Sequence, residues 1–529
     1  MAAHWLQELP VFRLLKRQSI LHSVVSHKLG YLAVAVVLFL TVQRSRRTRF
    51  PNHRGFTDES AEESTANKDK GVVTQFTNWA QCVTWRGTLF MPRTEPEIVA
   101  LIQRAVAERK QIRVVGACHS FSPAHTVAND RDIVLSLDHM DKLLQVDRAR
   151  MTVRVQAGIR LAALVEVLAN HSVALANTGT ILEQSVAGAI STGTHGTGAK
   201  FGSLSTQVVH VRLLTPAGAV DCSREQFPDV FRAACLSLGC LGVITEVSLK
   251  VVPAFRIHAE LQKAPFEEVL CNLDSYLKNN DHFKIWWLPH QEGCWLWLMN
   301  RTSKPDRLAQ WWEDFQGWYI HPYIGKILSH AVISSVALSE YVAATRVRHT
   351  HCATSAGTTY PTHAKHREVH PSLRPMLQMA YNIPIEHAAD ACRLLRSIIN
   401  THKFTIDFPI EIRFYKADDL LISPAFGRDT CNLNIMQVRE QDHEVWLRTA
   451  EEEIVRRYSG RPHWGKIHYM TTEQLRQAFP NWEQFRDIQR TLDPAGRFLN
   501  PYTERLLGNP TEAMTAPPVP ATNASRSSL

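Results

Sequence analysis

The 529-residue chain lacks the signatures of several common protein classes. Its ten cysteines are scattered, with no Cys-x-x-Cys pair and no cluster of His and Cys at the spacing of metal ligands. It has no Gly-Lys-Ser or Gly-Lys-Thr sequence of the kind that ends a P-loop, and no Gly-x-Gly-x-x-Gly sequence after a strand. These absences argue against a disulfide scaffold, a zinc domain, a P-loop domain and a Rossmann domain.

Most of the chain has almost no net charge. The formal charge is +9, but residues 1–50 hold eight Lys or Arg and a single acid, a surplus of +7. The other 479 residues therefore carry only +2. Proteins that bind nucleic acid usually attract it through clustered positive charge, so we expect no nucleic-acid partner.

An uncharged apolar run near the start, residues 29–42, has 14 residues, whereas a helix needs about 20 to cross a bilayer. Extending the run back to Ile20 provides the length but includes two histidines and a lysine. A membrane anchor, a secretory signal and a mitochondrial presequence are all open. No Ala-x-Ala site follows the run and a basic cluster does, which favours an anchor. We predict association with a mitochondrial or endoplasmic reticulum membrane through residues 20–43.

Composition marks off both ends of the chain. Residues 1–71 are this leader and a polar linker, since residues 51–70 are acidic and almost free of aliphatic side chains. Residues 510–529 are rich in Pro, Ala and Ser and indicate a disordered tail. The globular part is therefore about residues 72–509, and it contains no internal repeat.

Short strands alternate with helices at the start of the globular part. Thr94 precedes an apolar stripe typical of a helix, and a second such stripe follows Gly158. Apolar or alternating segments predict four strands, at residues 112–115, 132–137, 143–146 and 151–156. This alternation predicts an α+β or α/β domain.

Residues 186–204 hold the densest group of small residues. Glycines at 193, 196, 198 and 202 are interleaved with Ser and Thr. Backbone N–H groups in such a segment can approach a bound anion closely. From the residues alone, an anion-binding loop and a flexible glycine-rich turn are both open.

Two motifs in the first half resemble a known flavoprotein family. Residues 114–122 read Val-Val-Gly-Ala-Cys-His-Ser-Phe-Ser, and residues 181–198 read Ile-Leu-Glu-Gln-Ser-Val-Ala-Gly-Ala-Ile-Ser-Thr-Gly-Thr-His-Gly-Thr-Gly. Both are similar to the FAD-binding domain of the vanillyl-alcohol-oxidase-type flavoproteins. The resemblance implies an α+β fold of two domains, an FAD-binding domain at 72–254 and a substrate domain with an antiparallel sheet at 255–509.

Motifs in the second half narrow the resemblance to the sugar-1,4-lactone oxidases. They are Pro-Ile-Glu-Ile-Arg-Phe at 409–414, Arg-Pro-His-Trp-Gly-Lys-Ile-His at 461–468 and Leu-Asp-Pro-Ala-Gly-Arg-Phe-Leu-Asn-Pro at 492–501. The resemblance covers about residues 74–508. It implies FAD-dependent oxidation of an aldono-1,4-lactone to ascorbate or an analogue, with O2 reduced to hydrogen peroxide.

The resemblance also implies how FAD is held. Many family members attach the flavin to a histidine at the position of His119, and a neutral imidazole is a competent nucleophile near pH 7. We therefore expect covalent FAD. Cys118 departs from the family, because a small residue, often Gly, usually precedes this histidine. The other implied FAD contacts are Gly116, Ala117, Cys118, Ser120, Gly179, Gly188, Thr192, Gly193, Thr194, His195, Gly198 and Ile244.

Gly179, in Asn-Thr-Gly-Thr, resembles the position that controls access of oxygen to the flavin. Family members with Ala there tend to pass electrons to a protein acceptor, whereas Gly leaves space for oxygen. The resemblance therefore implies an oxidase. A turn glycine that requires a positive φ is the other interpretation.

Glu411 and Arg413 alternate with Ile410, Ile412 and Phe414. In a strand this pattern places both charges on one face and the apolar side chains on the other. From the residues alone, an exposed ion pair of little energetic value is the more common outcome. The resemblance instead implies that Glu411 binds substrate hydroxyls and that Arg413 stabilises developing negative charge.

Three further residues complete the implied catalytic set. Lys466 resembles the lysine near the reacting carbon, with a solvated lysine as the alternative, and Thr180 and His468 are weaker candidates. An alditol or sugar oxidase of the same fold and a lactone dehydrogenase that reduces a cytochrome are alternative functions. A flavin- or lactone-binding protein without turnover is a further alternative, which the Glu, Arg and Lys set disfavours.

Overall fold

The computed structural model describes residues 71–303, 376–406, 408–438 and 443–508. They belong to one compact unit, Gly55–Leu529. The predicted membrane segment at 20–43 and the predicted tail at 510–529 lie outside the described residues. Within the described ranges, no helix is both long enough and apolar enough to cross a membrane.

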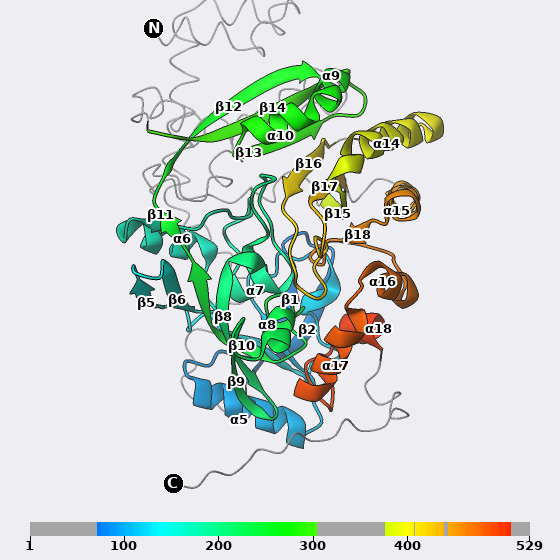
Figure 1. Cartoon of the computed structure of the whole chain (residues 1–529). Helices are drawn as coiled ribbons and strands as arrows, with labels where there is room; N and C mark the ends of the chain where they lie inside the picture. The colour runs from blue at the N-terminus through cyan, green and yellow to red at the C-terminus, as the bar shows by residue number, and fades with distance from the viewer. Residues whose placement is uncertain (1–70, 304–375, 407, 439–442, 509–529) are drawn as a thin grey trace, which may run out of the picture. The chain divides into compact units, whose positions relative to one another are not determined.

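The described chain begins with a four-stranded sheet and one helix: β1 (Val72–Thr77), β2 (Thr84–Phe90), α5 (Glu95–Ala107), β3 (Ile112–Val115) and β4 (Ile133–Ser136). The strand order is β1-β2-β4-β3, with β4 parallel to both of its neighbours. Figure 1 labels β1, β2 and α5 of this region. Thr94 caps α5 by accepting a hydrogen bond from the N–H of Glu97, and Ile98 and Ile102 are buried. The predicted helix start is therefore confirmed.

A five-stranded sheet and its helices follow: β5 (Leu143–Asp147), β6 (Thr152–Gln156), α6 (Leu161–Asn170), α7 (Val186–Ser191), β8 (Val208–Thr215), β9 (Gly218–Ser223), α8 (Pro228–Ala234) and β10 (Val243–Lys250). Its order is β5-β6-β10-β8-β9, and every pairing is antiparallel. A two-stranded sheet of β7 (Val173–Ala174) and β11 (Val252–Pro253) lies outside it. All four predicted strands and the helix after Gly158 are found.

The second half is built on a seven-stranded antiparallel sheet with four helices: β12 (Arg256–Pro265), α9 (Phe266–Cys271), α10 (Leu273–Asn279), β13 (His282–Trp287), β14 (Gly293–Thr302), β15 (Met376–Pro384), α14 (Ala388–His402), β16 (Ile410–Tyr415), β17 (Thr430–Val438), α15 (Glu444–Tyr458) and β18 (Arg461–Pro462). The order is β12-β14-β13-β16-β17-β15-β18, so β16 has β13 on one side and β17 on the other. Mostly antiparallel sheets make the fold α+β rather than α/β.

Three short helices end the described chain: α16 (Thr472–Ala478), α17 (Trp482–Leu492) and α18 (Pro501–Leu507). The segment between α17 and α18 returns to the first sheet. Ile112 donates its N–H to Arg497 O at 2.8 Å, and the buried Arg113 guanidinium donates to Phe498 O at 3.1 Å. The start and the end of the globular part therefore stabilise each other.

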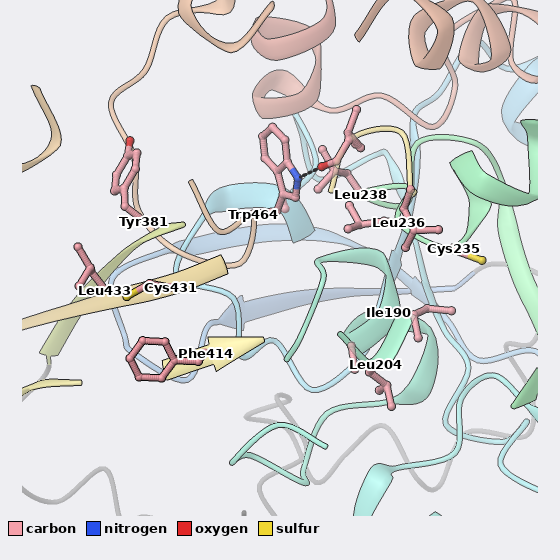
Figure 2. Close-up of a cluster of buried hydrophobic side chains, with 14 of the residues drawn as sticks. Ile190, Leu204, Cys235, Leu236, Leu238, Tyr381, Phe414, Cys431, Leu433 and Trp464 are labelled. Carbon is pink, nitrogen blue, oxygen red and sulfur yellow. Dashed lines mark hydrogen bonds between the residues drawn. The ribbon is translucent and has the colours of Figure 1, made fainter. Parts of the chain in front are cut away.

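A single hydrophobic cluster contains side chains of both halves. Figure 2 shows ten of its members: Ile190, Leu204, Cys235, Leu236 and Leu238 from the first half, and Tyr381, Phe414, Cys431, Leu433 and Trp464 from the second. Trp464 Nε1 donates to Ile422 O at 2.8 Å, the bond drawn there. Because the two halves share this core, the boundary at residue 254 stays a prediction.

Candidate active site

Glu411 and Arg413 lie on the same face of β16, and that face is buried. Glu411 is 3% exposed and the Arg413 side chain 14%. Arg413 Nη2 donates to Glu411 Oε2 at 2.6 Å. Ile410, Ile412 and Phe414 alternate with them and belong to the core. The predicted alternation is confirmed, and the interpretation as an exposed ion pair is wrong.

Strand β13 provides two partners of Glu411 that the sequence analysis missed. The antiparallel register pairs Lys284 with Arg413 and Trp286 with Glu411. Lys284 Nζ lies 3.1 Å and Trp286 Nε1 lies 2.9 Å from Glu411 Oε1. The only signal in the sequence was the alternation of these residues in His-Phe-Lys-Ile-Trp-Trp, which does not reveal the neighbouring strand.

Residues from two other parts of the chain bond to Glu411 Oε2 and to its partner Arg413. Asn434 Nδ2 of β17 lies 3.4 Å from Oε2, and Arg413 Nη2 also donates to Thr180 Oγ1 at 2.7 Å. Among the described residues, Arg413 Nε and Asn434 Oδ1 are buried without a hydrogen-bond partner. A ligand rich in hydroxyl groups offers both the acceptor and the donor that these atoms need. We call Glu411, Arg413, Lys284, Trp286, Asn434 and Thr180 the Glu411 cluster.

The charges of the Glu411 cluster favour an ionised carboxylate. Burial alone would raise the pKa of Glu411, but the positive charges of Arg413 and Lys284 and the bond from Trp286 outweigh burial. The pKa of this carboxyl therefore lies well below its usual value. Burial lowers the pKa of Lys284 to about 8 against the attraction of Glu411, so lysine and glutamate are both charged near pH 7.

Lys466 lies beside this cluster, in the segment that follows β18. Its Nζ donates to Gln378 Oε1 of β15 and lies 4.5 Å from the centre of the Phe121 ring. Burial and the charge of Arg413 lower the pKa of Lys466 to about 7, although Glu411 acts in the opposite direction. An amine with this pKa can accept a proton at neutral pH, which a solvated lysine cannot do efficiently.

The glycine-rich segment touches β16 directly. Residues 191–198 are all buried. The N–H of Gly198 donates to Phe414 O at 2.7 Å, and the rings of His195 and Tyr415 stack with centroids 4.2 Å apart. The segment therefore lies one or two residues from the charged pair on β16.

The loop that contains His119 touches the segment that contains Lys466. The N–H of Phe121 donates to Gly465 O at 2.9 Å, and Ser122 Oγ donates to Trp464 O at 2.7 Å. Both halves of the predicted site are thus brought together, although Ser122 and Trp464 are 342 residues apart in sequence.

His119 and Cys118 have unusual surroundings. The His119 ring stacks on Trp79, with centroids 5.6 Å apart and an interplanar angle of 25°. Cys118 has a φ of 52°, in the left-handed region that favours glycine, which explains why a small residue is usual before this histidine. Burial raises the pKa of the Cys118 thiol to about 12, so the thiol is neutral.

Three glycines make close contacts that a side chain would prevent. An added Cβ would lie 2.3 Å from Asn177 Oδ1 at Gly196, 2.5 Å from Ser185 Oγ at Gly116 and 2.6 Å from Thr194 Cγ2 at Gly179. Gly179 is not in the left-handed region, so its interpretation as a turn glycine is wrong. Asn177 Oδ1 is buried and has no hydrogen-bond partner within the described ranges.

These features fit an FAD site. Glycines at positions 116, 179 and 196 let the backbone pack closely against neighbouring segments, and the amide oxygen of Asn177, which has no partner among the described residues, can accept a hydrogen bond from a ligand. Gly193 and Gly198 have φ values of 73° and 124°, which other residues rarely adopt.

Several residues that were predicted to contact FAD make hydrogen bonds within or next to the glycine-rich segment. Thr192 Oγ1 donates to Gly188 O at 3.2 Å, and Thr194 Oγ1 pairs with the Gln184 amide. Gly188 lies in α7, which Ser185 caps. These threonine hydroxyls are engaged within the loop, so anion binding there would rely on the backbone.

Ile244 and His468 lie apart from the charged residues. Ile244 belongs to β10, where it pairs with Leu213 and packs in the core. His468 Nε2 bonds to Tyr502 of α18 at 2.8 Å, and burial lowers the pKa of His468 to about 3. An FAD contact of Ile244 and a catalytic role of His468 stay predictions. The bond to Tyr502 and the low pKa of His468 do not favour the catalytic role.

Comparison with known proteins bears on both halves of the chain. An FAD binding domain matches residues 88–223, and D-arabinono-1,4-lactone oxidase matches residues 247–506. Over 466 residues the chain is 34% identical to L-gulonolactone oxidase of Mus musculus, which covers 83% of this chain and 98% of that protein. The chain belongs to the aldonolactone oxidase family. His119 and the glycine-rich segment fall in the first match, and the Lys284, Glu411 and Lys466 positions fall in the second.

A second sequence relative and a solved structure are also similar to this chain. L-gulono-1,4-lactone dehydrogenase of Mycobacterium tuberculosis is 32% identical over 452 residues, 82% of this chain and 99% of that protein. Cholesterol oxidase from Brevibacterium sterolicum has the same fold, with a TM-score of 0.68 at 17% identity over 82% of this chain and 97% of that one. The predicted two-domain flavoprotein fold is therefore confirmed, as is the relationship to FAD-dependent lactone oxidases.

Proposed function

We propose that the protein is an FAD-dependent oxidoreductase that oxidises a hydroxyl-bearing carbon of an aldono-1,4-lactone, producing ascorbate or an analogue. The observation that carries this proposal is the buried Glu411 cluster, with Lys466 beside it, on a strand that contacts the glycine-rich segment through Phe414 and Tyr415. The names of the relatives support D-arabinono- and L-gulono-1,4-lactone as substrates, and L-galactono-1,4-lactone belongs to the same chemical class.

FAD, when bound, supplies the hydride acceptor and returns the electrons to an acceptor. The backbone around Gly116, Gly179 and residues 191–198 would hold it, since the family motifs include these segments and the amide oxygen of Asn177 beside Gly196 has no partner among the described residues. The remaining residues orient the lactone and control charge and protons.

Glu411 orients the substrate rather than removing its proton. Its Oε1 already accepts two hydrogen bonds from β13, and the pKa of this carboxyl is held low. Such a carboxylate is a weak base but a strong hydrogen-bond acceptor. Its Oε2, with Asn434 Oδ1 beside it, is suited to the hydroxyl groups of a lactone.

Lys466 accepts the proton of the hydroxyl that becomes a keto group, and Arg413 stabilises the negative charge that develops on that oxygen. Arg413 has a buried Nε without a partner in the described chain, so it has a donor to offer. Lys466 has a pKa of about 7, close to the pH at which an efficient general base works.

For the electron acceptor we propose oxygen, with hydrogen peroxide as the second product. Gly179 supports this through its resemblance to the position that controls access of oxygen to the flavin, where the backbone packs against Thr194. A dehydrogenase that reduces a protein acceptor is the second candidate, favoured by the similarity to L-gulono-1,4-lactone dehydrogenase.

We also propose that FAD is linked to His119 and that residues 20–43 hold the protein at a mitochondrial or endoplasmic reticulum membrane. The covalent link is supported by the position of His119 within the family motif, in a loop that contacts segment 463–466. The membrane association rests on the apolar run and its basic flank alone.

A substrate panel tests the central proposal. The full-length protein should consume oxygen and release hydrogen peroxide with at least one of D-arabinono-, L-gulono- and L-galactono-1,4-lactone. The kcat/KM for that lactone should exceed those for xylitol and sorbitol about tenfold or more, because a site built to bond polar groups rejects a ligand that leaves them unpaired. Faster oxidation of the polyols would favour an alditol oxidase. If none of the five compounds reduced the bound flavin, the proposed enzyme activity would be refuted.

The role of Lys466 predicts a pH dependence. Below pH 7 the amine is increasingly protonated, so kcat/KM should fall about tenfold per pH unit there and level off above pH 7. Lys466→Met should lower kcat/KM about 100-fold or more and abolish this dependence. Lys416→Met, at an exposed position next to β16, is the control. The same acid limb in Lys466→Met would show that another group is the base.

The role of Gly179 is tested with a companion substitution, because the new methyl would lie 2.6 Å from Thr194 Cγ2. Thr194→Ser removes that methyl group. Gly179→Ala/Thr194→Ser should consume oxygen more slowly than Thr194→Ser, while both reduce a dye acceptor at equal rates. Equal oxygen consumption by the two variants would contradict control of oxygen access by Gly179.

Covalent attachment is tested by acid precipitation. The precipitated protein should retain yellow, fluorescent flavin, and His119→Ala should release it to the supernatant. His258→Ala, at an exposed histidine of β12, should leave the retained flavin unchanged. Free flavin from the unsubstituted protein would show that no covalent bond is formed.

A further inference from the structure

Lys284 is a charged side chain in a place where charge is costly. It is completely buried, with a side-chain exposure of 0%. Removing an ammonium group from water is unfavourable unless a partner compensates for the lost hydration. The partner here is Glu411 Oε1, 3.1 Å from Lys284 Nζ.

Aromatic rings enclose the rest of this ammonium. Its Nζ lies 5.3 Å from the centre of the Trp286 ring and 4.7 Å from that of Trp297, distances at which an aromatic ring attracts a cation. With no exposed surface, Lys284 cannot contact a substrate. Its effect on the reaction must act through Glu411.

The Glu411 carboxylate has a cation at each oxygen. Lys284 occupies Oε1 together with Trp286, and Arg413 occupies Oε2. One negative charge between two positive charges leaves a surplus of one. Lys284 has no exposed surface, whereas the Arg413 side chain is 14% exposed and its Nε has no hydrogen-bond partner among the described residues. The surplus charge is therefore available at Arg413.

We propose that Lys284 is a positioning residue that neutralises Glu411 and thereby makes the charge of Arg413 available to the oxygen of the carbon being oxidised. This inference rests on the proposed function and deepens it. Without Lys284, the Arg413 charge would be compensated by Glu411, and the site would lose the positive charge that stabilises the transition state.

The test is Lys284→Met, which keeps an unbranched side chain one atom shorter and removes the charge. We expect kcat with the best lactone to fall about 10- to 100-fold, and KM to change less than about threefold, because Arg413 acts on charge that develops during the reaction. Bound flavin should be unchanged. If this variant does not fold, Lys284→Gln, which keeps a hydrogen-bond donor without the charge, should show the same loss.

Trp286→Phe is the matched control. It removes a neutral hydrogen bond from the same oxygen of Glu411 and retains the Lys284 charge. Its kcat should fall less than that of Lys284→Met, because the positive charge beside Glu411 remains. An equal loss of kcat in Lys284→Met and Trp286→Phe would show that carboxylate geometry matters rather than charge, and would overturn the proposal, as would an unchanged kcat in Lys284→Met.

A second readout does not require turnover. Glu411→Gln leaves Lys284 as an uncompensated buried charge, so adding Lys284→Met should raise the melting temperature above that of Glu411→Gln alone. A double variant that melts no higher than Glu411→Gln would overturn the counter-charge role even if no lactone is oxidised. If no compound of the substrate panel were oxidised, the proposed function would be refuted. The melting temperatures would still test whether Lys284 is the counter-charge of Glu411.

Discussion

The carboxylate of Glu411 is buried and nevertheless ionised, and this requires a precise set of neighbours. Burial disfavours the charge, so the cations of Arg413 and Lys284 and the indole N–H of Trp286 must compensate for the lost water. Three adjacent strands, β13, β16 and β17, provide these groups and Asn434. The register of the seven-stranded sheet therefore determines the electrostatics of the site.

The surroundings of Glu411 also depend on close packing between the two halves of the chain. Thr180 and the glycine-rich segment come from the first half, yet they touch Arg413 and Phe414 of β16. The shared hydrophobic cluster holds these contacts in place. A site assembled in this way excludes water from Glu411, which strengthens the charge interactions of its carboxylate.

Much of the fold could be predicted from local patterns. The helix after Thr94, the strand at 112–115 and the charge alternation at 410–414 follow from periodicity and capping, which depend on neighbouring residues only. The motif around His119 and the glycines pointed to FAD by resemblance. The roles of Lys284 and Trp286 could not be predicted, because the sequence of an aromatic strand with a lysine is the same whether that lysine faces solvent or a carboxylate.

The sequence by itself determined the class of protein, the likeness to aldonolactone oxidases and the identity of Glu411, Arg413 and Lys466 as candidates. Only the tertiary structure decided that the charged pair is buried, that Lys284 is its third member, that Gly179 serves close packing rather than a turn, and that His468 bonds to Tyr502. The physical reason is that burial and ion pairing depend on strand register and on contacts between residues far apart in the chain, and no local pattern records these.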